Sequence, residues 1–295
     1  MNPESDLHIG VAGWSYEDWK GVVYPPGQKS KLSFMARYLD LIEVNTSFYR
    51  PLDPGLAHKW VREVSDREGF RFTAKLYQKF THDLDKGYPG PESVEQVTRG
   101  FAPLDEAGGL MAVLVQFPFY FRDSEDSRAR LERISDDFGQ FPLVLEVRDA
   151  SWAKPEALQF VGSLGMNIAC LDMPLTRRSF REKALTTGPI AYLRLHGRNY
   201  DAWFSKEAER DDRYNYLYGD DEIDFTIERI QRLQDMSEQA VVVWNNHFSG
   251  KAVVNALETT NRLFDEPVDV PPLLLKSYPR LSKISRDRGG PLFEQ

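Results

Sequence analysis

Short apolar runs recur along the chain and alternate with longer amphipathic stretches. The runs are rich in β-branched residues, which is typical of buried strands, and they begin near residues 7, 41, 71, 111, 143, 167, 191 and 240. Most of the intervening stretches carry apolar residues three or four positions apart, as on one face of a helix. These stretches are 31–40, 55–65, 93–108, 127–139, 154–165 and 224–236. The pattern therefore predicts strands that alternate with helices.

This alternation predicts an α/β fold with parallel strands, because parallel neighbours need a crossover connection. Eight strand–helix units favour a single closed (β/α)8 barrel of the TIM type, for which about 250 residues are typical. An open, doubly wound sheet is the alternative. No GxGxxG follows the first strand and no GxxxxGK[ST] occurs in the chain, so nucleotide-binding versions of the open sheet are disfavoured.

We expect one barrel domain over residues 1–265, followed by a C-terminal segment. Residues 198–222 form a long, aromatic-rich insertion after the seventh strand. Residues 266–295 are rich in proline, which predicts an irregular tail that packs on the barrel or trails from it.

Charge and cysteine content narrow the possible classes. The formal net charge of −8 disfavours a nucleic-acid partner, although a local basic groove stays possible. The single cysteine, Cys170, leaves no intrachain disulfide framework. No apolar stretch approaches membrane-spanning length, and the first residues lack the pattern of a signal peptide. We therefore expect a cytoplasmic protein without a membrane partner, and the sequence leaves its oligomeric state open.

Polar and charged residues gather at the ends of the apolar runs, whereas the starts are mostly apolar. The residues at the ends are Trp14, Ser15, Glu43, Asn45, Lys75, Gln116, Glu146, Arg148, Asp172, Arg194, His196, Asn245, Asn246 and His247. Three pairs are spaced two residues apart and so share one strand face; these are Glu43/Asn45, Glu146/Arg148 and Arg194/His196. Catalytic groups of TIM barrels sit at the carboxyl ends of the strands, so this set predicts a site there.

Structural roles compete with functional ones for several of these residues. Glu146, Arg148 and Arg194 could form an ion-pair network that closes the barrel. Asn45 and Asp172 could satisfy backbone groups of the loops, as short polar side chains often do.

Lys75 could pair with Glu43 or Glu146, or it could act as a Schiff-base nucleophile. A divalent metal is a further possibility, because carboxylates and imidazoles of suitable kinds end neighbouring strands; they are Glu43, Glu146, Asp172, His196 and His247. The chain has no compact ligand spacing such as HExxH, and three cations share the same mouth. We therefore expect no metal or other cofactor.

Aromatic residues are frequent in the loops that follow the first, second, fourth and seventh strands. Beside arginine and histidine they would suit a base, a sugar ring or an aromatic acid. Most of them also fit a role in packing loops onto the rim. Trp14 and Trp203 are the candidates for ligand contact.

Several blocks of the sequence together resemble a known family. In order, between residue 9 and about residue 258, they are "IGVAGWSYEDWKGVVYP", "LIEVNTSFYR", "FRFTAKLYQKFTH", "VLVQFPF", "LEVRDASW", "YLRLHGR", "DRYNYLYGDDEI" and "VVVWNNHFSGKAVVNALE". This set is similar to the signature blocks of domain-of-unknown-function family 72. The resemblance implies a TIM-type barrel without an established reaction. Its motif residues here are Trp14, Glu43, Asn45, Lys75, His82, Gln116, Glu146, Arg148, Arg194, His196, Asn245 and Asn246.

The first hypothesis is an enzyme, a hydrolase or an isomerase, that acts on a small polar and anionic ligand. Lys75, Arg148 and Arg194 would bind the anion. Glu43 or Glu146 would be the general acid or base, with His196 as proton-transfer partner. Further contacts to the substrate are expected from Trp14, Asn45, Gln116, Trp203, Asn245 and Asn246.

Two alternatives stay open. One is a metal-dependent phosphodiesterase that acts on nucleic acid, with Glu43, Glu146, Asp172 and His196 as metal ligands and the basic segment 276–288 on phosphates. The other is a non-catalytic barrel that binds a ligand or a partner through its aromatic rim.

Overall fold

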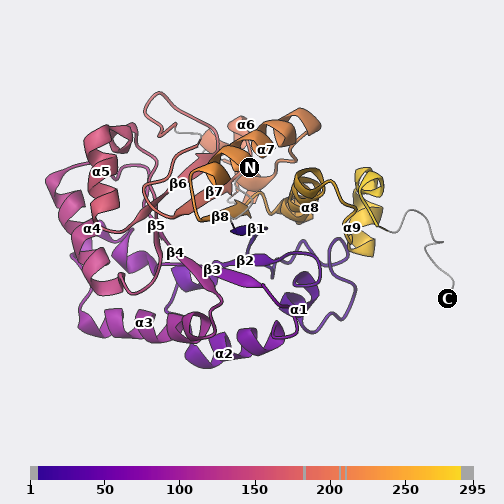
Figure 1. The fold of residues 1–295 in the computed structure, drawn as a ribbon, viewed down its shortest axis with the longest axis horizontal. Helices are drawn as coiled ribbons and strands as arrows, with labels where there is room; N and C mark the ends of the chain where they lie inside the picture. The colour runs from indigo at the N-terminus through magenta and orange to yellow at the C-terminus, as the bar shows by residue number, and fades with distance from the viewer. Residues whose placement is uncertain (1–5, 182–183, 206, 210, 287–295) are drawn as a thin grey trace.

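The computed structural model describes residues 6–181, 184–205, 207–209 and 211–286. Eight parallel strands close into a barrel in the order of the sequence (Figure 1). They are β1 (Asp6–Ala12), β2 (Leu41–Val44), β3 (Arg71–Lys75), β4 (Leu110–Gln116), β5 (Leu143–Glu146), β6 (Asn167–Asp172), β7 (Ile190–Leu195) and β8 (Gln239–Trp244). Each strand lies where an apolar run predicted it, so the predicted TIM-type barrel is confirmed.

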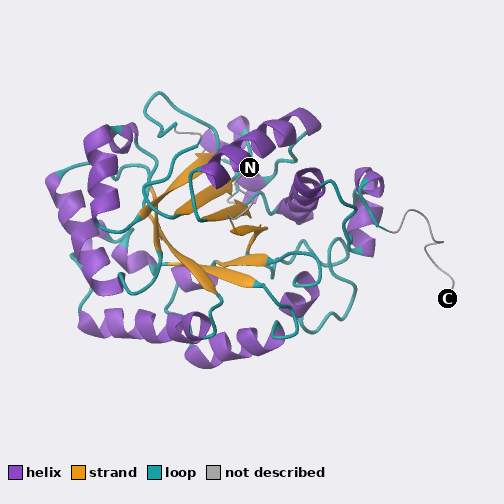
Figure 2. Cartoon of the chain, in the orientation of Figure 1, coloured by secondary structure: helices purple, strands orange, loops and turns teal. Residues whose placement is uncertain are grey.

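Helices surround the strands (Figure 2). They are α1 (Lys31–Met35), α2 (Pro54–Glu63), α3 (Pro91–Glu106), α4 (Glu125–Phe138), α5 (Pro155–Ser163), α6 (Tyr200–Phe204), α7 (Asp220–Asp235) and α8 (Lys251–Phe264). All stretches with helical periodicity form helices, and α6 and α8 are additions to them. The described residues between β6 and β7 contain no helix, so the strand–helix alternation is interrupted there.

Local sequence signals set where several helices begin. Asp53 caps α2 by accepting a hydrogen bond from the Leu56 amide at 2.8 Å. Ser124 caps α4 by accepting from the Ser127 amide at 3.3 Å. Proline occupies the first turn of α2, α3 and α5, where its missing N–H would have no helical partner in any case. These signals fix the lengths of the loops that lead away from the strands.

Strand β7 shows how the two faces of the barrel wall are divided. Ala191, Leu193 and Leu195 belong to the large apolar core between the strands and the helices. Tyr192 belongs to a smaller core inside the barrel. Because side chains alternate along a strand, Arg194 shares the inward face with Tyr192. A charged residue therefore points into the barrel from a strand whose other face is apolar.

The segments outside the barrel are partly regular. In the insertion, α6 is followed by a 3-10 turn at Asp211–Tyr214. The tail, which was expected to be irregular, contains α9 (Pro272–Ser277) and a 3-10 helix at Pro279–Lys283. Leu274 and Leu281 in this segment are fully buried, so apolar residues between the prolines hold it on the barrel.

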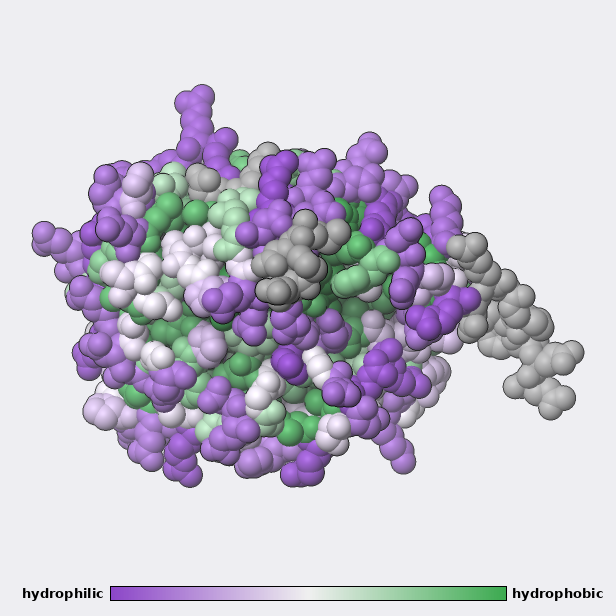
Figure 3. Space-filling view, viewed as in Figure 1, coloured by the Kyte–Doolittle hydropathy of each residue, from purple (hydrophilic) through white to green (hydrophobic). Residues whose placement is uncertain are grey.

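Hydrophilic side chains are spread over the face of the molecule in Figure 3, with smaller hydrophobic areas between them. Among the described residues, no helix has the length and apolar character needed to span a bilayer.

Candidate active site at the carboxyl ends of the strands

A cavity of about 230 Å³ opens at the carboxyl ends of the strands, and we name it the mouth cavity. Every strand except β6 contributes to its wall, from the strand end or from the segment behind it. The lining residues are Tyr16, Asn45, Phe48, Tyr49, Lys75, Gln78, His82, Gln116, Arg148, Arg194, His196, Tyr214, Asn245 and His247. The predicted gathering of polar strand ends is therefore present in the structure.

Arg194 joins two buried carboxylates behind the mouth cavity. Its Nε and Nη2 donate to Oε2 and Oε1 of Glu43 at 3.0 and 2.6 Å, and its Nη1 donates to Oε2 of Glu146 at 2.5 Å. Both carboxylates are fully buried, and Arg194 is 1% exposed. An unpaired ion at this depth would cost several kcal/mol, so these charges depend on one another. With Arg148 they form what we name the Arg194 cluster.

Neighbouring side chains hold the two carboxylates in place. The Tyr192 hydroxyl donates to Oε2 of Glu43 at 3.0 Å, and Nη2 of Arg148 donates to Oε1 of Glu146 at 3.1 Å. Burial raises the pKa of Glu146, but the attraction of Arg194 and Arg148 outweighs burial and holds this pKa well below its usual range. Glu146 is therefore an ionised and anchored group, poorly suited to take up a proton near pH 7.

His196 presents one ring nitrogen that the protein leaves unused. Nδ2 of Asn245 donates to Nδ1 of His196 at 2.9 Å. Nε2 of His196 has no hydrogen-bond partner in the described part of the chain, and Oε1 of Glu146 is 4.0 Å away. Burial and the charge of Arg194 hold the pKa of His196 well below its usual value, so the ring is neutral at pH 7. Since Nδ1 accepts, the ring proton lies on Nε2.

Two more buried atoms at the mouth cavity lack partners among the described residues. They are Nε of Arg148, which is a donor, and Oε1 of Gln116, which is an acceptor. Buried polar atoms in proteins are nearly always hydrogen-bonded to protein or water. Several unpaired atoms around one cavity therefore indicate a place for a polar molecule.

Lys75 ends β3 with its ammonium over the Phe48 ring, 4.6 Å from the ring centroid. No described carboxylate lies within 4.0 Å of its Nζ. The pairing with Glu43 or Glu146, one of the two alternatives for Lys75, is not formed, because Arg194 occupies both carboxylates. Burial and the charge of Arg194 lower the pKa of Lys75 to about 8.

His82 is a second neutral imidazole at the mouth cavity. Burial and the charge of Lys75 lower its pKa to about 4. Its ring meets the Phe48 ring edge-on, with 4.9 Å between centroids. Near pH 7 His82 and His196 are therefore uncharged, and neither adds to the positive charge that Lys75 and Arg148 bring to the cavity.

The residues predicted to catalyse or to bind substrate fall into two groups. Those that line the mouth cavity are Asn45, Lys75, Gln116, Arg148, Arg194, His196 and Asn245. Those outside its lining are Trp14, Glu43, Glu146, Trp203 and Asn246. Glu43 and Glu146 reach the cavity only through Arg194 and Arg148.

The other three make contacts that support the structure around the cavity. Trp14 packs edge-on against Trp60 of α2, with 5.0 Å between centroids. Trp203 lies edge-on to His196 at 6.1 Å. Nδ2 of Asn246 donates to the carbonyl oxygen of Tyr216 at 2.8 Å, which fixes the insertion against β8.

Loops supply lining residues that the strand pattern did not identify as ligand contacts. They are Tyr16, Phe48, Tyr49, Gln78 and Tyr214, together with His247, which the strand pattern had offered only as a metal donor. The Tyr16 ring stacks on the His247 ring, with 4.2 Å between centroids and 5° between planes. Nε1 of Trp19 donates to the His247 carbonyl at 2.7 Å, so the loops after β1 and β8 are joined. For all of them except Tyr214, which lies far behind β7 in the insertion, the sequence signal was a position a few residues behind a strand end.

Asp172, at the end of β6, belongs to a different network. Arg198 donates to both of its oxygens at 2.8 and 2.7 Å, the Tyr218 hydroxyl donates at 2.8 Å, and Nη1 of Arg229 donates at 3.1 Å. Burial raises the pKa of Asp172, but its hydrogen bonds and the two arginines outweigh burial and lower it. We name these four residues the Asp172 cluster.

The metal-dependent alternative required four donors to converge, namely Glu43, Glu146, Asp172 and His196. Arg194 takes up the carboxylates of the first two, and Asp172 lies in its own cluster. Within the ranges that the structure describes, no group of three or more His, Cys, Asp or Glu residues is placed to hold a metal ion. These donors therefore do not fit a resident divalent cation.

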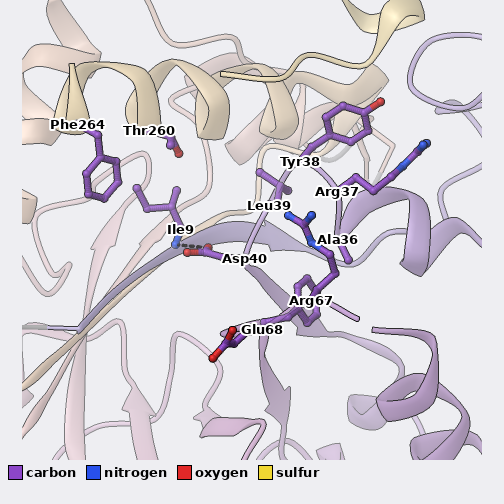
Figure 4. A pocket seen from close by; sticks show the side chains of 11 residues that line it. Ile9, Ala36, Arg37, Tyr38, Leu39, Asp40, Arg67, Glu68, Thr260 and Phe264 are labelled. Atoms are coloured by element: carbon purple, nitrogen blue, oxygen red, sulfur yellow. Dashed lines mark hydrogen bonds between the residues drawn. The ribbon is translucent and has the colours of Figure 1, made fainter. Parts of the chain in front are cut away.

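Two further cavities lie outside the mouth. One, of about 180 Å³, lies at the amino ends of the strands between α8 and the segment before β2 (Figure 4). There the Ile9 amide donates to Oδ1 of Asp40 at 3.0 Å. The other, of about 410 Å³, lies beside the Asp172 cluster. None of the buried unpaired side-chain atoms found among the described residues belongs to either lining, so the mouth cavity is the stronger candidate.

Comparisons with known proteins agree with this architecture. The family model described as "Protein of unknown function DUF72" matches residues 8–278. The UPF0759 protein YunF of Bacillus subtilis (strain 168) is 28% identical over 264 residues, which cover 84% of this chain and 92% of that protein.

Solved structures give the same result. A DUF72 family protein from Thermotoga maritima MSB8 is 31% identical with a TM-score of 0.78, over 88% of this chain and 99% of that one. Another, from Enterococcus faecalis V583, is 27% identical with a TM-score of 0.77, over 90% of this chain and 98% of that one. The resemblance seen in the sequence blocks is confirmed, and the chain belongs to the DUF72 family.

Proposed function

We propose that this protein is an enzyme, a hydrolase or an isomerase, that performs acid–base chemistry on a small polar anion in the mouth cavity. The observation that carries the proposal is the set of polar atoms around this cavity that have no hydrogen-bond partner among the described residues. They are Nζ of Lys75, Nε of Arg148, Nε2 of His196 and Oε1 of Gln116. A network with a purely structural role would satisfy such atoms internally.

The balance of charge around the cavity favours an anion. In the Arg194 cluster two carboxylates face two guanidinium groups, which leaves no excess of either sign. Lys75 adds one positive charge, while His82 and His196 are neutral. The volume of about 230 Å³ lies below the roughly 300–1,000 Å³ of clefts for drug-sized ligands. These features support a small ligand with about one negative charge.

The unpaired atoms support a division of roles. Lys75 and Arg148 would bind the anionic group, and Oε1 of Gln116 would accept from a hydroxyl. Nε2–H of His196 would donate to an oxygen that gains negative charge, since a neutral imidazole can polarise a carbonyl. Lys75 has a pKa of about 8, so it can exchange a proton in the working range. Glu43 and Glu146 would hold Arg194 rather than act as the base.

A ligand screen followed by a turnover assay tests the proposal. Small carboxylates, sugar phosphates and nucleotides are screened for a rise in melting temperature, because a ligand that binds only the folded state stabilises it. Ligands that raise it are followed by proton NMR in D2O. An isomerase exchanges a C–H next to a carbonyl for deuterium, and a hydrolase releases a new species.

Two histidine variants serve as the matched pair in this assay. His196→Phe removes the donor and should lower turnover by about two orders of magnitude, as loss of one preorganised donor commonly does. His58→Phe changes an exposed histidine on α2 and should leave turnover unchanged. A ligand that binds in the cavity and is recovered unchanged would contradict the enzyme and favour a binding protein. No binding by any class would contradict the anion site itself.

A further inference from the structure

Two lysines with a lowered pKa stand near the carboxyl ends of the strands, and they differ in their surroundings. Lys251 lies at the start of α8, where its Nζ donates to Oδ1 of Asn215, and burial lowers its pKa. It does not belong to the lining of the mouth cavity. Lys75 does line the cavity, and its Nζ has no hydrogen bond or ion pair with a described side chain. Of these two lysines, Lys75 is the one that presents an amine uncommitted to any described side chain to a ligand in the cavity.

We propose that Lys75 is a nucleophile that forms a reversible imine with the carbonyl carbon of a small anionic aldehyde or ketone. The inference rests on the proposed function, and it names the substrate class for the same cavity. It also changes the role of Lys75, which attacks the carbonyl carbon of the ligand in addition to attracting its negative charge.

The arrangement of partners around Lys75 carries this proposal. The carboxylates that would otherwise turn the lysine into a structural cation, Glu43 and Glu146, are engaged by Arg194. The Phe48 ring supports the ammonium from one side and offers it no proton acceptor. Nε of Arg148 stays available for the anionic group of the ligand. Nε2–H of His196 can donate to the carbonyl oxygen.

The electrostatic surroundings agree with a nucleophilic lysine. Burial and the charge of Arg194 lower the pKa of Lys75 to about 8. In roughly a tenth of the molecules the Lys75 amine is then neutral at pH 7, against well under a thousandth for a lysine with the ordinary pKa of about 10.4. Desolvation beside another cation is an established way to activate a lysine for this chemistry.

The step balances without an oxidant or a further reactant. The nitrogen lone pair of neutral Lys75 forms a bond to the carbonyl carbon, while the C=O π pair moves to oxygen and takes up a proton. The nitrogen loses a proton, and the resulting carbinolamine expels its hydroxyl, protonated to water. The product is a protonated imine, and water reverses the sequence. This iminium withdraws electrons from the adjacent C–H bond more strongly than the carbonyl did, which favours proton abstraction there.

Reductive trapping on the full chain tests the proposal. The probes are pyruvate and dihydroxyacetone phosphate, each with sodium cyanoborohydride, which reduces an imine to a stable secondary amine. Intact mass shows the adduct, and peptide mapping assigns it. Lactate and glycerol 3-phosphate are the matched alcohols, and their effect on melting temperature tests anion binding without any imine. Lys75→Arg and Lys251→Arg are compared with the wild type after circular dichroism confirms folding.

The expected result is one adduct on Lys75 with at least one probe, formed about tenfold or more faster than labelling of Lys251. It should be lost in Lys75→Arg and kept in Lys251→Arg. Equal labelling of both lysines, or an adduct that persists in Lys75→Arg, overturns the nucleophile. In another outcome, an alcohol raises the melting temperature while the matched carbonyl compound forms no adduct. That result also overturns Lys75 as a nucleophile, but it leaves the proposed function standing. If the alcohols do not stabilise the protein and the carbonyl probes form no adduct, the result counts against both the nucleophile and the proposed function.

Discussion

The Arg194 cluster and the Asp172 cluster are both buried networks of arginine and carboxylate at the same end of the barrel, yet they differ in what they leave unpaired. Asp172 accepts from three side chains, and Arg198, which binds it on one side, also donates to Glu222 at 2.8 Å. Around Arg194 the carboxylates are equally engaged. Nε of Arg148 and Nε2 of the neighbouring His196, however, have no partner among the described residues.

On our proposal, this difference separates a network that joins structural elements from one that stands behind a candidate site. The Asp172 cluster connects β6 to the insertion and to α7, and the hydrogen bonds to its carboxylate come from its own members. The Arg194 cluster has the same kinds of charge, but it lies behind a cavity toward which unpaired atoms are gathered. Burial of charge alone therefore does not identify a site. Polar atoms without partners beside a cavity are the more informative sign.

The largest effect is expected from breaking the Arg194 cluster at its centre. Arg194→Met leaves the carboxylates of Glu43 and Glu146 buried without their main partner, and the free energy of unfolding should fall by about 3–5 kcal/mol. Urea denaturation measures it. Arg232→Met is the matched control, because Arg232 forms only an exposed pair with Glu228; its effect should stay below about 0.5 kcal/mol. Similar losses in both variants would contradict the dependence of the cluster on Arg194.

The second effect tests whether the Asp172 cluster is only structural. Asp172→Asn weakens the hydrogen bonds from Arg198 and Arg229, and the free energy of unfolding should fall by about 2 kcal/mol. Stabilisation of the protein by lactate, measured as the shift in melting temperature, should equal that of the wild type. A lost shift in a variant that still folds would place Asp172 in the site.

The third effect runs in the opposite direction. Lys75→Met removes an unpaired, partly buried cation, so the free energy of unfolding should stay within about 1 kcal/mol of the wild type or rise. The affinity for lactate should fall about tenfold, in line with the 1.5–3 kcal/mol of a hydrogen bond to a charged group. Calorimetric titration measures the affinity and chemical denaturation the stability. A Lys75→Met variant that loses stability but keeps its affinity for lactate would show that Lys75 has a structural role and does not bind the anion.

The smallest effect is a pH dependence of anion binding. Lys75 is protonated below its pKa of about 8 and neutral above it, so affinity for lactate should be highest below pH 8 and fall as the pH rises. Between pH 7 and pH 8.5 the decrease should be about fourfold, because lactate itself does not titrate in this range. Lys75→Arg should bind with constant affinity over the same interval. A flat profile in the wild type would mean that Lys75 does not contact the anion.

The fold was predictable because barrel strands have a strong signal. Each is a short apolar run, and strand–helix alternation leaves few topologies. The inward direction of Arg194 followed from its position between Leu193 and Leu195. The helix α9 was missed, because its six residues are too few for a periodic pattern and Leu274 is buried by tertiary contact.

The candidate site was predictable in part. Residues at strand ends, such as Lys75 and His196, were found because strand direction fixes where they lie. Gln78 and Tyr214 stand on short 3-10 turns that have no periodic signal in the sequence, so their position at the cavity depends on three-dimensional packing. The sequence also could not decide which carboxylates Arg194 would engage. That choice depends on barrel geometry, which brings together residues 151 positions apart, Glu43 and Arg194.

The join between the loops after β1 and β8 has a consequence for the order of events in folding. Trp19 and its acceptor on His247 are 228 positions apart in sequence. Closing so long a loop is entropically costly until the intervening strands have paired. The wall of the mouth cavity therefore depends on segments from both ends of the barrel sequence, and it is incomplete in any chain that lacks the segment around His247. A molecule that fits the cavity would distinguish finished barrels from nascent or truncated ones, and its binding would serve as a readout of complete maturation.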